Sequence, residues 1–299
     1  MTAALFRLAL PDGSIRLAAG DVDGGPARLL DPKLTIAALL RAGATALAEA
    51  VADRVDRGDA VPRDVRVLAP VDEQEVWAAG VTYERSRDAR MEESTEASVY
   101  DRVYAAERPE LFFKAAAWRV RGPGETIGVR TDSAWNVPEP ELALVVTAGG
   151  EIAGYSLGND VSSRSIEGEN PLYVPQAKVY DGACALGPAL VPASAAHPPF
   201  PLRLVVERAG STVIDAATST ARIVRPLEEL VGWLCRALEL PAGAILLTGT
   251  GVVPETPFTL TAGDRVRIDG GPLGVLENLV VNVGREATRE SGVQGTGSR

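Results

Sequence analysis

The chain has 299 residues, 46% of them hydrophobic, which is enough to bury the core of one large domain and a smaller one and argues against intrinsic disorder. Its 30 Lys and Arg residues against 40 Asp and Glu residues give a formal net charge of −10, which argues against nucleic acids and anionic membranes as partners. No apolar run is long enough to cross a membrane, and the short apolar start does not resemble a signal peptide, so we expect a cytoplasmic protein. Cys184 and Cys235 lie far apart, and we expect two buried free thiols.

The first 68 residues predict a small N-terminal α/β module. Alternating segments on either side of residues 11–13, Pro-Asp-Gly, predict a β-hairpin. A stretch rich in charges and turn formers, residues 57–64, is expected to link the module to the rest of the chain. Between the two, apolar residues recur at helical spacing and predict one helix: Ile36, Leu39, Leu40, Leu47, Val51 and Val55.

Residues 69–288 predict a second, larger domain made mostly of short strands. A polar stretch, residues 86–107, predicts a helix, and apolar residues from Leu227 to Leu238 predict an amphipathic one. Strands are predicted at residues 76–83, 111–115, 141–148, 152–160, 185–191, 202–210, 244–250, 265–270 and 274–283. Many strands and few helices indicate an α+β domain built on a folded, mixed β-sheet core. Residues 289–299 lack apolar anchors and are expected to form a flexible tail.

Three carboxylates in this domain predict a metal site. Glu139 and Glu141 are two positions apart in an apolar run that predicts a strand, so their side chains point to the same face. Like charges on a buried face are costly unless a cation neutralises them. Asp160 ends the next predicted strand, and Lys178 follows. Three carboxylates without a histidine favour Mg²⁺ or Mn²⁺ over Zn²⁺, although an acidic strand edge facing water is the alternative.

The order of these residues resembles the fumarylacetoacetate hydrolase family. Its paired glutamates, its later aspartate in a D-V-S-x-R motif and its lysine beyond are matched by Glu139, Glu141, Asp160, Arg164 and Lys178. Residues 245–280 are similar to the family's closing TGTP segment and its glycine-rich pattern. The resemblance covers residues 69–283. It implies a Mg²⁺- or Mn²⁺-dependent enzyme that acts on a 2-oxo acid or a 1,3-dicarbonyl compound and forms a homodimer or homotetramer.

Several stretches narrow the resemblance to the branch that dehydrates 2-keto-3-deoxy sugar acids: residues 82–90, 104–115, 139–146 and 169–182. Hydrolytic members use a histidine–glutamate pair to activate water, whereas the single histidine here, His197, lies outside every motif and is expected to be structural or solvated. This favours dehydration of a 2-keto-3-deoxypentonate to 2,5-dioxopentanoate through a metal-stabilised enolate. The alternatives are a C–C bond hydrolase or decarboxylase acting on acylpyruvates, and a sugar-acid-binding module without catalysis.

Two interpretations of Lys178 remain open. It either removes the C3 proton of the substrate or stays charged and balances the carboxylates. The resemblance places Glu110 near the open metal position, where it acts on water or on the leaving hydroxyl. Thr250, in a Gly-rich turn, is expected to bind the substrate carboxylate, and Arg164 is expected to pair with a structural carboxylate. Further substrate contacts are implied for Arg85, Ser86 and Lys114.

Overall fold

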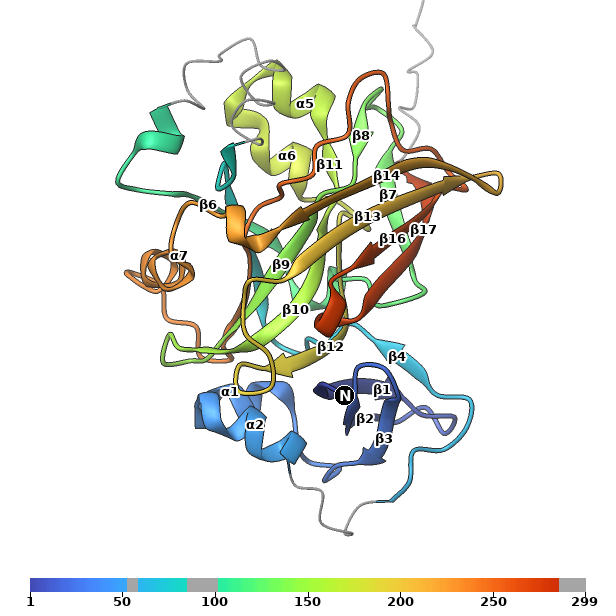
Figure 1. Ribbon diagram of the computed structural model, residues 1–299, viewed down its shortest axis with the longest axis vertical. Helices are drawn as coiled ribbons and strands as arrows, with labels where there is room; N and C mark the ends of the chain where they lie inside the picture. Colours follow the sequence, from blue (N-terminus) through green and yellow to red (C-terminus); the bar gives the residue numbers. More distant parts are fainter. Residues whose placement is uncertain (53–58, 85–101, 285–299) are drawn as a thin grey trace, which may run out of the picture.

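The computed structural model describes residues 1–52, 59–84 and 102–284. A ten-stranded sheet, a five-stranded sheet and a two-stranded ribbon hold the strands of these residues, and short helices lie around them (Figure 1). This arrangement confirms the α+β class with a mixed β-sheet core. Within the described ranges, no helix is both long and apolar enough to span a membrane.

The ten-stranded sheet carries the predicted carboxylates. In spatial order its strands are β3 (Gly25–Leu29), β2 (Ile15–Asp21), β1 (Ala3–Ala9), β12 (Cys184–Pro192), β10 (Ile152–Asp160), β9 (Pro140–Val146), β15 (Ala244–Leu247), β5 (Glu75–Gly80) and β6 (Glu110–Ala115), and β4 (Arg66–Leu68) pairs with β1. β15 and β5 are parallel, and the other neighbours are antiparallel. Every residue of β9 is buried, so an ionised side chain on this strand needs a charged partner.

The five-stranded sheet packs against one face of β9 and β10 (Figure 1). Its strands are, in order, β14 (Ser211–Ser219), β13 (Pro201–Arg208), β16 (Arg265–Asp269), β17 (Val275–Val283) and β7 (Thr126–Arg130). Leu144 of β9, Leu157 of β10 and Leu204 of β13 belong to one buried cluster, which forms the main core. The ribbon joins β8 (Asn136–Val137) to β11 (Ser162–Ser163) directly beside the carboxylates.

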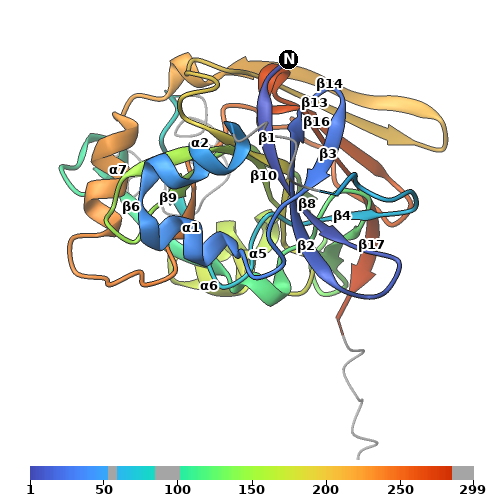
Figure 2. The same ribbon diagram turned by 90° about the horizontal axis from the view of Figure 1, so that it is seen from below.

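The N-terminal residues form the predicted hairpin, with Ala3 opposite Asp21 and Ala9 opposite Ile15. β1 also pairs with β12, Leu5 opposite Leu190, so the strands β1–β4 extend the sheet that carries the carboxylates. Helices from this region lie across the sheet in Figure 2, where α2 (Ala44–Ala52) contacts β10 and β1. The boundaries at residues 68 and 288 stay a prediction.

The single helix predicted from Ile36 to Val55 is wrong, because the chain breaks at Gly43. α1 (Ile36–Ala42) ends there and α2 begins at the next residue. Gly43 has φ 109° and ψ 177°, a combination that side chains other than hydrogen rarely permit. Leu40 of α1 and Leu47 of α2 therefore reach the same buried cluster from two different helices. Val55 lies outside the described residues.

We expect Gly43→Ala to lower the free energy of unfolding by about 1–3 kcal/mol, because alanine must adopt a glycine-only backbone conformation. Gly232→Ala is the matched control. Gly232 lies within a helix, α7 (Leu227–Leu234), and a Cβ there meets open space. The same substitution should therefore stabilise the protein by about 0.5–1 kcal/mol. Urea unfolding of both variants measures the difference, and equal effects at the two sites would contradict this account.

Short helices follow among the described residues of the larger domain. α5 (Arg164–Glu169) and α6 (Val174–Lys178) lie at one end of β9 and β10 (Figure 1). α7 confirms the predicted amphipathic helix, but it ends before Leu238, which is exposed. Residues 102–105 are helical, and most of the helix predicted at 86–107 lies outside the described residues. Single 3₁₀ turns occupy Ala117–Arg119, Pro171–Tyr173, Thr220–Arg222 and Gly271–Leu273.

Candidate metal centre

Glu139, Glu141 and Asp160 converge where β9 and β10 run side by side. Glu141 lies opposite Gly158 in the β9–β10 ladder, and the Asp160 amide donates to the Glu139 carbonyl oxygen at 3.0 Å. One carboxylate oxygen from each residue lies within 4.8 Å of the other two, and the three residues are only 1–3% exposed. Three converging, buried carboxylates offer the oxygen ligands that a hard divalent cation prefers.

Lys178, the last residue of α6, closes one side of this cluster. Its Nζ donates to Glu139 Oε2 at 2.8 Å, Asp160 Oδ2 at 3.0 Å and Ser162 Oγ at 2.6 Å. An ammonium group has three protons, and each has an acceptor here. The geometry therefore holds Lys178 as a cation that balances two of the carboxylates.

Lys114, on β6, supports Asp160 from behind. Its Nζ lies 2.5 Å from Asp160 Oδ1 and donates to the carbonyl oxygens of Val161 at 3.0 Å and Lys178 at 2.6 Å. The Lys114 side chain is fully buried, and its ammonium group has three protein oxygens around it: one carboxylate oxygen and two carbonyl oxygens. Lys114 was expected to contact the substrate, whereas this geometry favours positioning of Asp160.

Arg164 was expected to pair with a structural carboxylate, and it pairs with the candidate ligand Glu139 as well as with Glu167. Its guanidinium lies 2.9 Å from Glu139 Oε1 and 3.6 Å from Glu167 Oε2. Arg164 begins α5 and Glu167 follows one turn later, so both side chains lie on the same face of the helix. Sequence analysis did not single out Glu167, although its spacing from Arg164 was a usable signal.

The formal charges around the cluster fit a divalent cation. Three cations, Lys114, Arg164 and Lys178, face five acidic side chains, so full ionisation of all five would leave two negative charges among the described residues. Burial, with the charges of Asp160 and Glu139, raises the pKa of Glu141 well above its usual value. The Glu141 carboxylate accepts a hydrogen bond from the Gly249 amide at 2.6 Å. The five carboxylates are Glu110, Glu139, Glu141, Asp160 and Glu167.

A small pocket opens onto the cluster and brings other predicted residues to it. Glu110, at the start of β6, and Thr250, beyond β15, both line this pocket. The Glu110 carboxylate lies so close to Gly80 that a Cβ there would come within 2.1 Å of it. Thr250 is 4% exposed, and its hydroxyl donates to the Val252 carbonyl oxygen at 3.2 Å. Two predicted substrate contacts, Arg85 and Ser86, lie outside the described residues.

The histidine and the two cysteines differ in their exposure to solvent. His197 is exposed in the loop between β12 and β13, as the sequence predicted. Both cysteines are free thiols. Cys184 is buried, which raises its pKa to about 12, whereas Cys235 is only half-buried, contrary to expectation.

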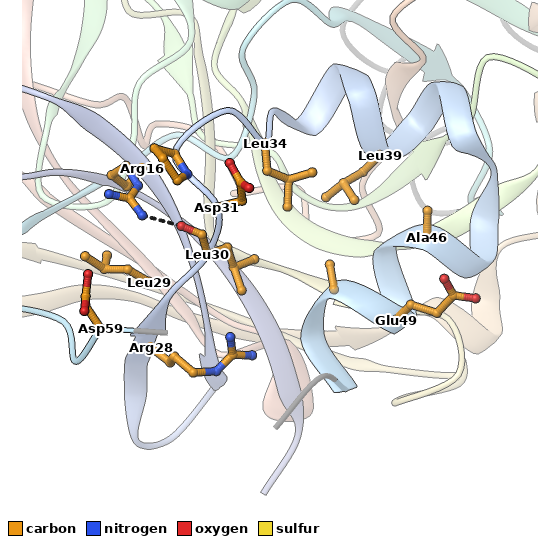
Figure 3. Close-up of a pocket in the computed structure, with 12 residues that line it drawn as sticks. Arg16, Arg28, Leu29, Leu30, Asp31, Leu34, Leu39, Ala46, Glu49 and Asp59 are labelled. Carbon is orange, nitrogen blue, oxygen red and sulfur yellow. Dashed lines mark hydrogen bonds between the residues drawn. The ribbon is translucent and has the colours of Figure 1, made fainter. Parts of the chain in front are cut away.

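A cavity larger than the pocket at the carboxylate cluster lies in the N-terminal region. It measures about 760 Å³ and lies between the hairpin side of the region and helices α1 and α2 (Figure 3). Arg16 in its wall donates to the Leu30 carbonyl oxygen. Guanidinium and carboxylate groups are scattered along its walls and do not converge on one point. Around Asp160, in contrast, three carboxylates converge. Size alone therefore does not make it the candidate site.

Comparison with known proteins agrees with this geometry. Residues 75–281 match the model of the fumarylacetoacetate (FAA) hydrolase C-terminal domain. Over 250 residues the chain is 48% identical to a probable 2-keto-3-deoxyxylonate dehydratase of Haloferax volcanii, with 83% of this chain and 86% of that protein covered. Over 219 residues it is 41% identical to 2-dehydro-3-deoxy-D-arabinonate dehydratase of Saccharolobus solfataricus, with 71% and 74% covered.

A solved structure of 2-keto-3-deoxy-D-arabinonate dehydratase complexed with magnesium and 2,5-dioxopentanoate has the same fold. It superposes with a TM-score of 0.80 at 33% identity, and the match covers 94% of this chain and 99% of that one. The agreement extends over both sheets and the N-terminal region, beyond the residues that the family model matches. The chain therefore belongs to the fumarylacetoacetate hydrolase family.

Proposed function

We propose that this protein is a Mg²⁺- or Mn²⁺-dependent hydro-lyase that converts a 2-keto-3-deoxypentonate into 2,5-dioxopentanoate. The observation that carries the proposal is the buried carboxylate trio, whose pocket holds two further carboxylates and no histidine. The chain has a single histidine, His197, and it is exposed elsewhere, so a histidine–glutamate pair for water activation is not available. The names of the Haloferax and Saccharolobus relatives support the same reaction class.

Glu139, Glu141 and Asp160 would hold the ion, which when bound supplies a Lewis acid that makes the C3 protons next to the C2 ketone more acidic. Lys178 stays an ammonium and keeps Glu139 and Asp160 in place, because its three protons already have acceptors. This choice favours the second of the two interpretations of Lys178. Glu110 faces the pocket from β6 and transfers a proton to the departing C4 hydroxyl.

Substrate recognition is proposed for one residue of the pocket and for two residues outside the described ranges. Thr250, which lines the pocket, is proposed to bind the substrate carboxylate. Arg85 and Ser86, just beyond β5, are proposed to contact the sugar hydroxyls. A change of Thr250 that weakens substrate binding should raise KM more than it lowers kcat.

The proposed reaction predicts formation of an aldehyde only when a divalent ion is present. Purified protein with Mg²⁺ and 2-keto-3-deoxypentonate should produce 2,5-dioxopentanoate, measured by aldehyde derivatisation, and EDTA should stop this production. An acylpyruvate assayed in parallel is the control for the hydrolase and decarboxylase alternative. Cleavage of the acylpyruvate without aldehyde formation from the pentonate would reject the proposal.

The protein is proposed to act in the cytoplasm as a homodimer or homotetramer. Free thiols at Cys184 and Cys235 support a reducing compartment. Exposed apolar side chains at Trp118 and Leu172, which are 74% and 84% exposed, support contact with a second copy. Sedimentation of the purified protein as a monomer would reject the oligomer.

A further inference from the structure

The proposed dehydration needs two proton-transfer groups with opposite starting states. One must take a proton from C3, and the other must give a proton to the C4 oxygen as it leaves. Glu110 is assigned to the leaving oxygen. The group that acts at C3 must lie in the same pocket, must be able to accept a proton, and must not be a metal ligand.

Only one described residue that lines the pocket meets these conditions. Glu139, Glu141 and Asp160 are the candidate ligands, and Lys178 has no free position for a proton. After Glu110, the one titratable group left among the described lining residues is Glu167. We propose that Glu167 is the catalytic base that removes the C3 proton, an inference that rests on the proposed dehydration.

The local structure prepares Glu167 for this role. α5 begins at Arg164, directly after the ribbon strand that follows Asp160, and its first turn brings Glu167 to the pocket that the candidate ligands line. Glu167 is 4% exposed, which removes water from its carboxylate. Arg164 lies 3.6 Å from Glu167 Oε2 and 2.9 Å from Glu139 Oε1, so its shorter contact goes to the candidate ligand. Arg164 therefore balances the charge of the ionised Glu167 carboxylate.

The protons and electrons balance with these two carboxylates. Glu167 takes a C3 proton, and the electron pair of that C–H bond forms an enolate. The enolate collapses to a C3–C4 double bond as the C4–O bond breaks, and Glu110 protonates the hydroxyl, which leaves as water. Glu110, now ionised, removes a C5 proton while Glu167 returns its proton to C3. The resulting C4–C5 enol becomes the aldehyde as its O–H proton moves to C4, and both carboxylates regain their starting states.

Proton exchange at C3 separates the base from the acid. 2-Oxopentanoate lacks both substrate hydroxyls, so it can lose a C3 proton but has nothing to eliminate. In D₂O with Mg²⁺, ¹H NMR should show C3 exchange by the wild type and by Glu110→Gln. Glu167→Gln should slow this exchange at least about 100-fold, the usual contribution of a general base. The pentonate itself gives a second arm: Glu110→Gln should exchange its C3 protons without forming aldehyde, and the Glu110→Gln/Glu167→Gln double variant should not.

Mg²⁺ titration calorimetry distinguishes catalysis from positioning. A base leaves the Mg²⁺ affinity of Glu167→Gln within about threefold of wild type, whereas a residue that only holds Arg164 on Glu139 would weaken it, and saturating Mg²⁺ would restore exchange. If Glu167→Gln does not fold, Glu167→Asp replaces it in the test. The aspartate keeps the negative charge beside Arg164, so this variant should fold and should show slowed C3 exchange. The assignment is overturned if Glu167→Gln or Glu167→Asp exchanges the C3 protons at the wild-type rate. It is also overturned if the wild-type protein exchanges the C3 protons of neither 2-oxopentanoate nor the pentonate. Normal exchange by the wild type without aldehyde from the pentonate would instead reject the dehydration and leave the base in place.

Discussion

Replacing Glu141 with glutamine is expected to abolish Mg²⁺ binding and dehydration while making the metal-free protein more stable. Glu141 is 1% exposed, and its carboxylate lies among those of Glu139 and Asp160. Within the described site, the Glu141 carboxylate accepts a hydrogen bond from the Gly249 amide. Glu139 and Asp160, in contrast, each form an ion pair with a cationic side chain. Glutamine has the same shape and still accepts the Gly249 hydrogen bond through its amide oxygen, but it carries no charge to bind the ion.

The pH dependence of stability follows from the same carboxylate. Burial, with the charges of Asp160 and Glu139, raises the pKa of Glu141 in the folded state above its value in the unfolded chain. A raised carboxyl pKa means that the unfolded chain releases this proton first, so metal-free stability falls as the pH rises from the unfolded value through the folded one. Glu141→Gln removes that group, and the difference in unfolding free energy between variant and wild type should therefore increase toward neutral pH.

Thermal unfolding with and without Mg²⁺ measures both effects. For the wild type, Mg²⁺ at 100 times its dissociation constant should stabilise the folded state by about 2.7 kcal/mol. The Glu141→Gln variant should show no Mg²⁺-dependent rise in Tm and a higher Tm in EDTA. Glu207→Gln, an exposed change on β13, is the matched control and should keep the Mg²⁺ response. A Glu141→Gln variant that still gains Tm on Mg²⁺ addition would remove Glu141 from the ligand set.

The carboxylate cluster could be predicted from the sequence because two of its three carboxylates lie in or next to one buried strand. A run of apolar residues from Pro140 to Val146 predicts a buried strand, and the structure buries all of it. Two charges two positions apart in such a run need a partner, whatever the rest of the fold is. The core strands were similarly visible, since each is short, apolar and bounded by turn residues.

Other features could not be predicted because they depend on contacts far apart in the chain or on backbone geometry. β14 has exposed and half-buried residues, many of them polar, and it forms through pairing with β13, so its sequence lacks an apolar pattern. The helix break at Gly43 requires a backbone conformation that the apolar spacing of the helix does not reveal. Glu167 becomes a site residue only because Arg164 reaches Glu139 from a different element.

Lys114 shows how position in the fold changes the role of a predicted site residue. The chain has only three lysines, Lys33, Lys114 and Lys178, and its other basic residues are arginines. Lys33 is exposed, whereas the other two are buried beside Asp160. A lysine carries a compact charge that can donate to three acceptors in different directions, which a planar guanidinium cannot copy. Lys114 uses this property to join Asp160 to the carbonyl oxygens of Val161 and Lys178.

Lys114→Met is therefore expected to reduce stability strongly rather than to weaken substrate binding alone. The change keeps the length of the buried side chain but leaves two carbonyl oxygens without their donor and Asp160 Oδ1 without its cationic partner. Removing one partner of a buried ion pair costs about 3–5 kcal/mol, and urea unfolding in EDTA should show a loss of this size. Lys33→Met, the control on the surface, should change stability by less than about 0.5 kcal/mol. If Lys114→Met instead raised KM with stability unchanged, Lys114 would be a substrate ligand, and the assignment of Asp160 positioning to it would be wrong.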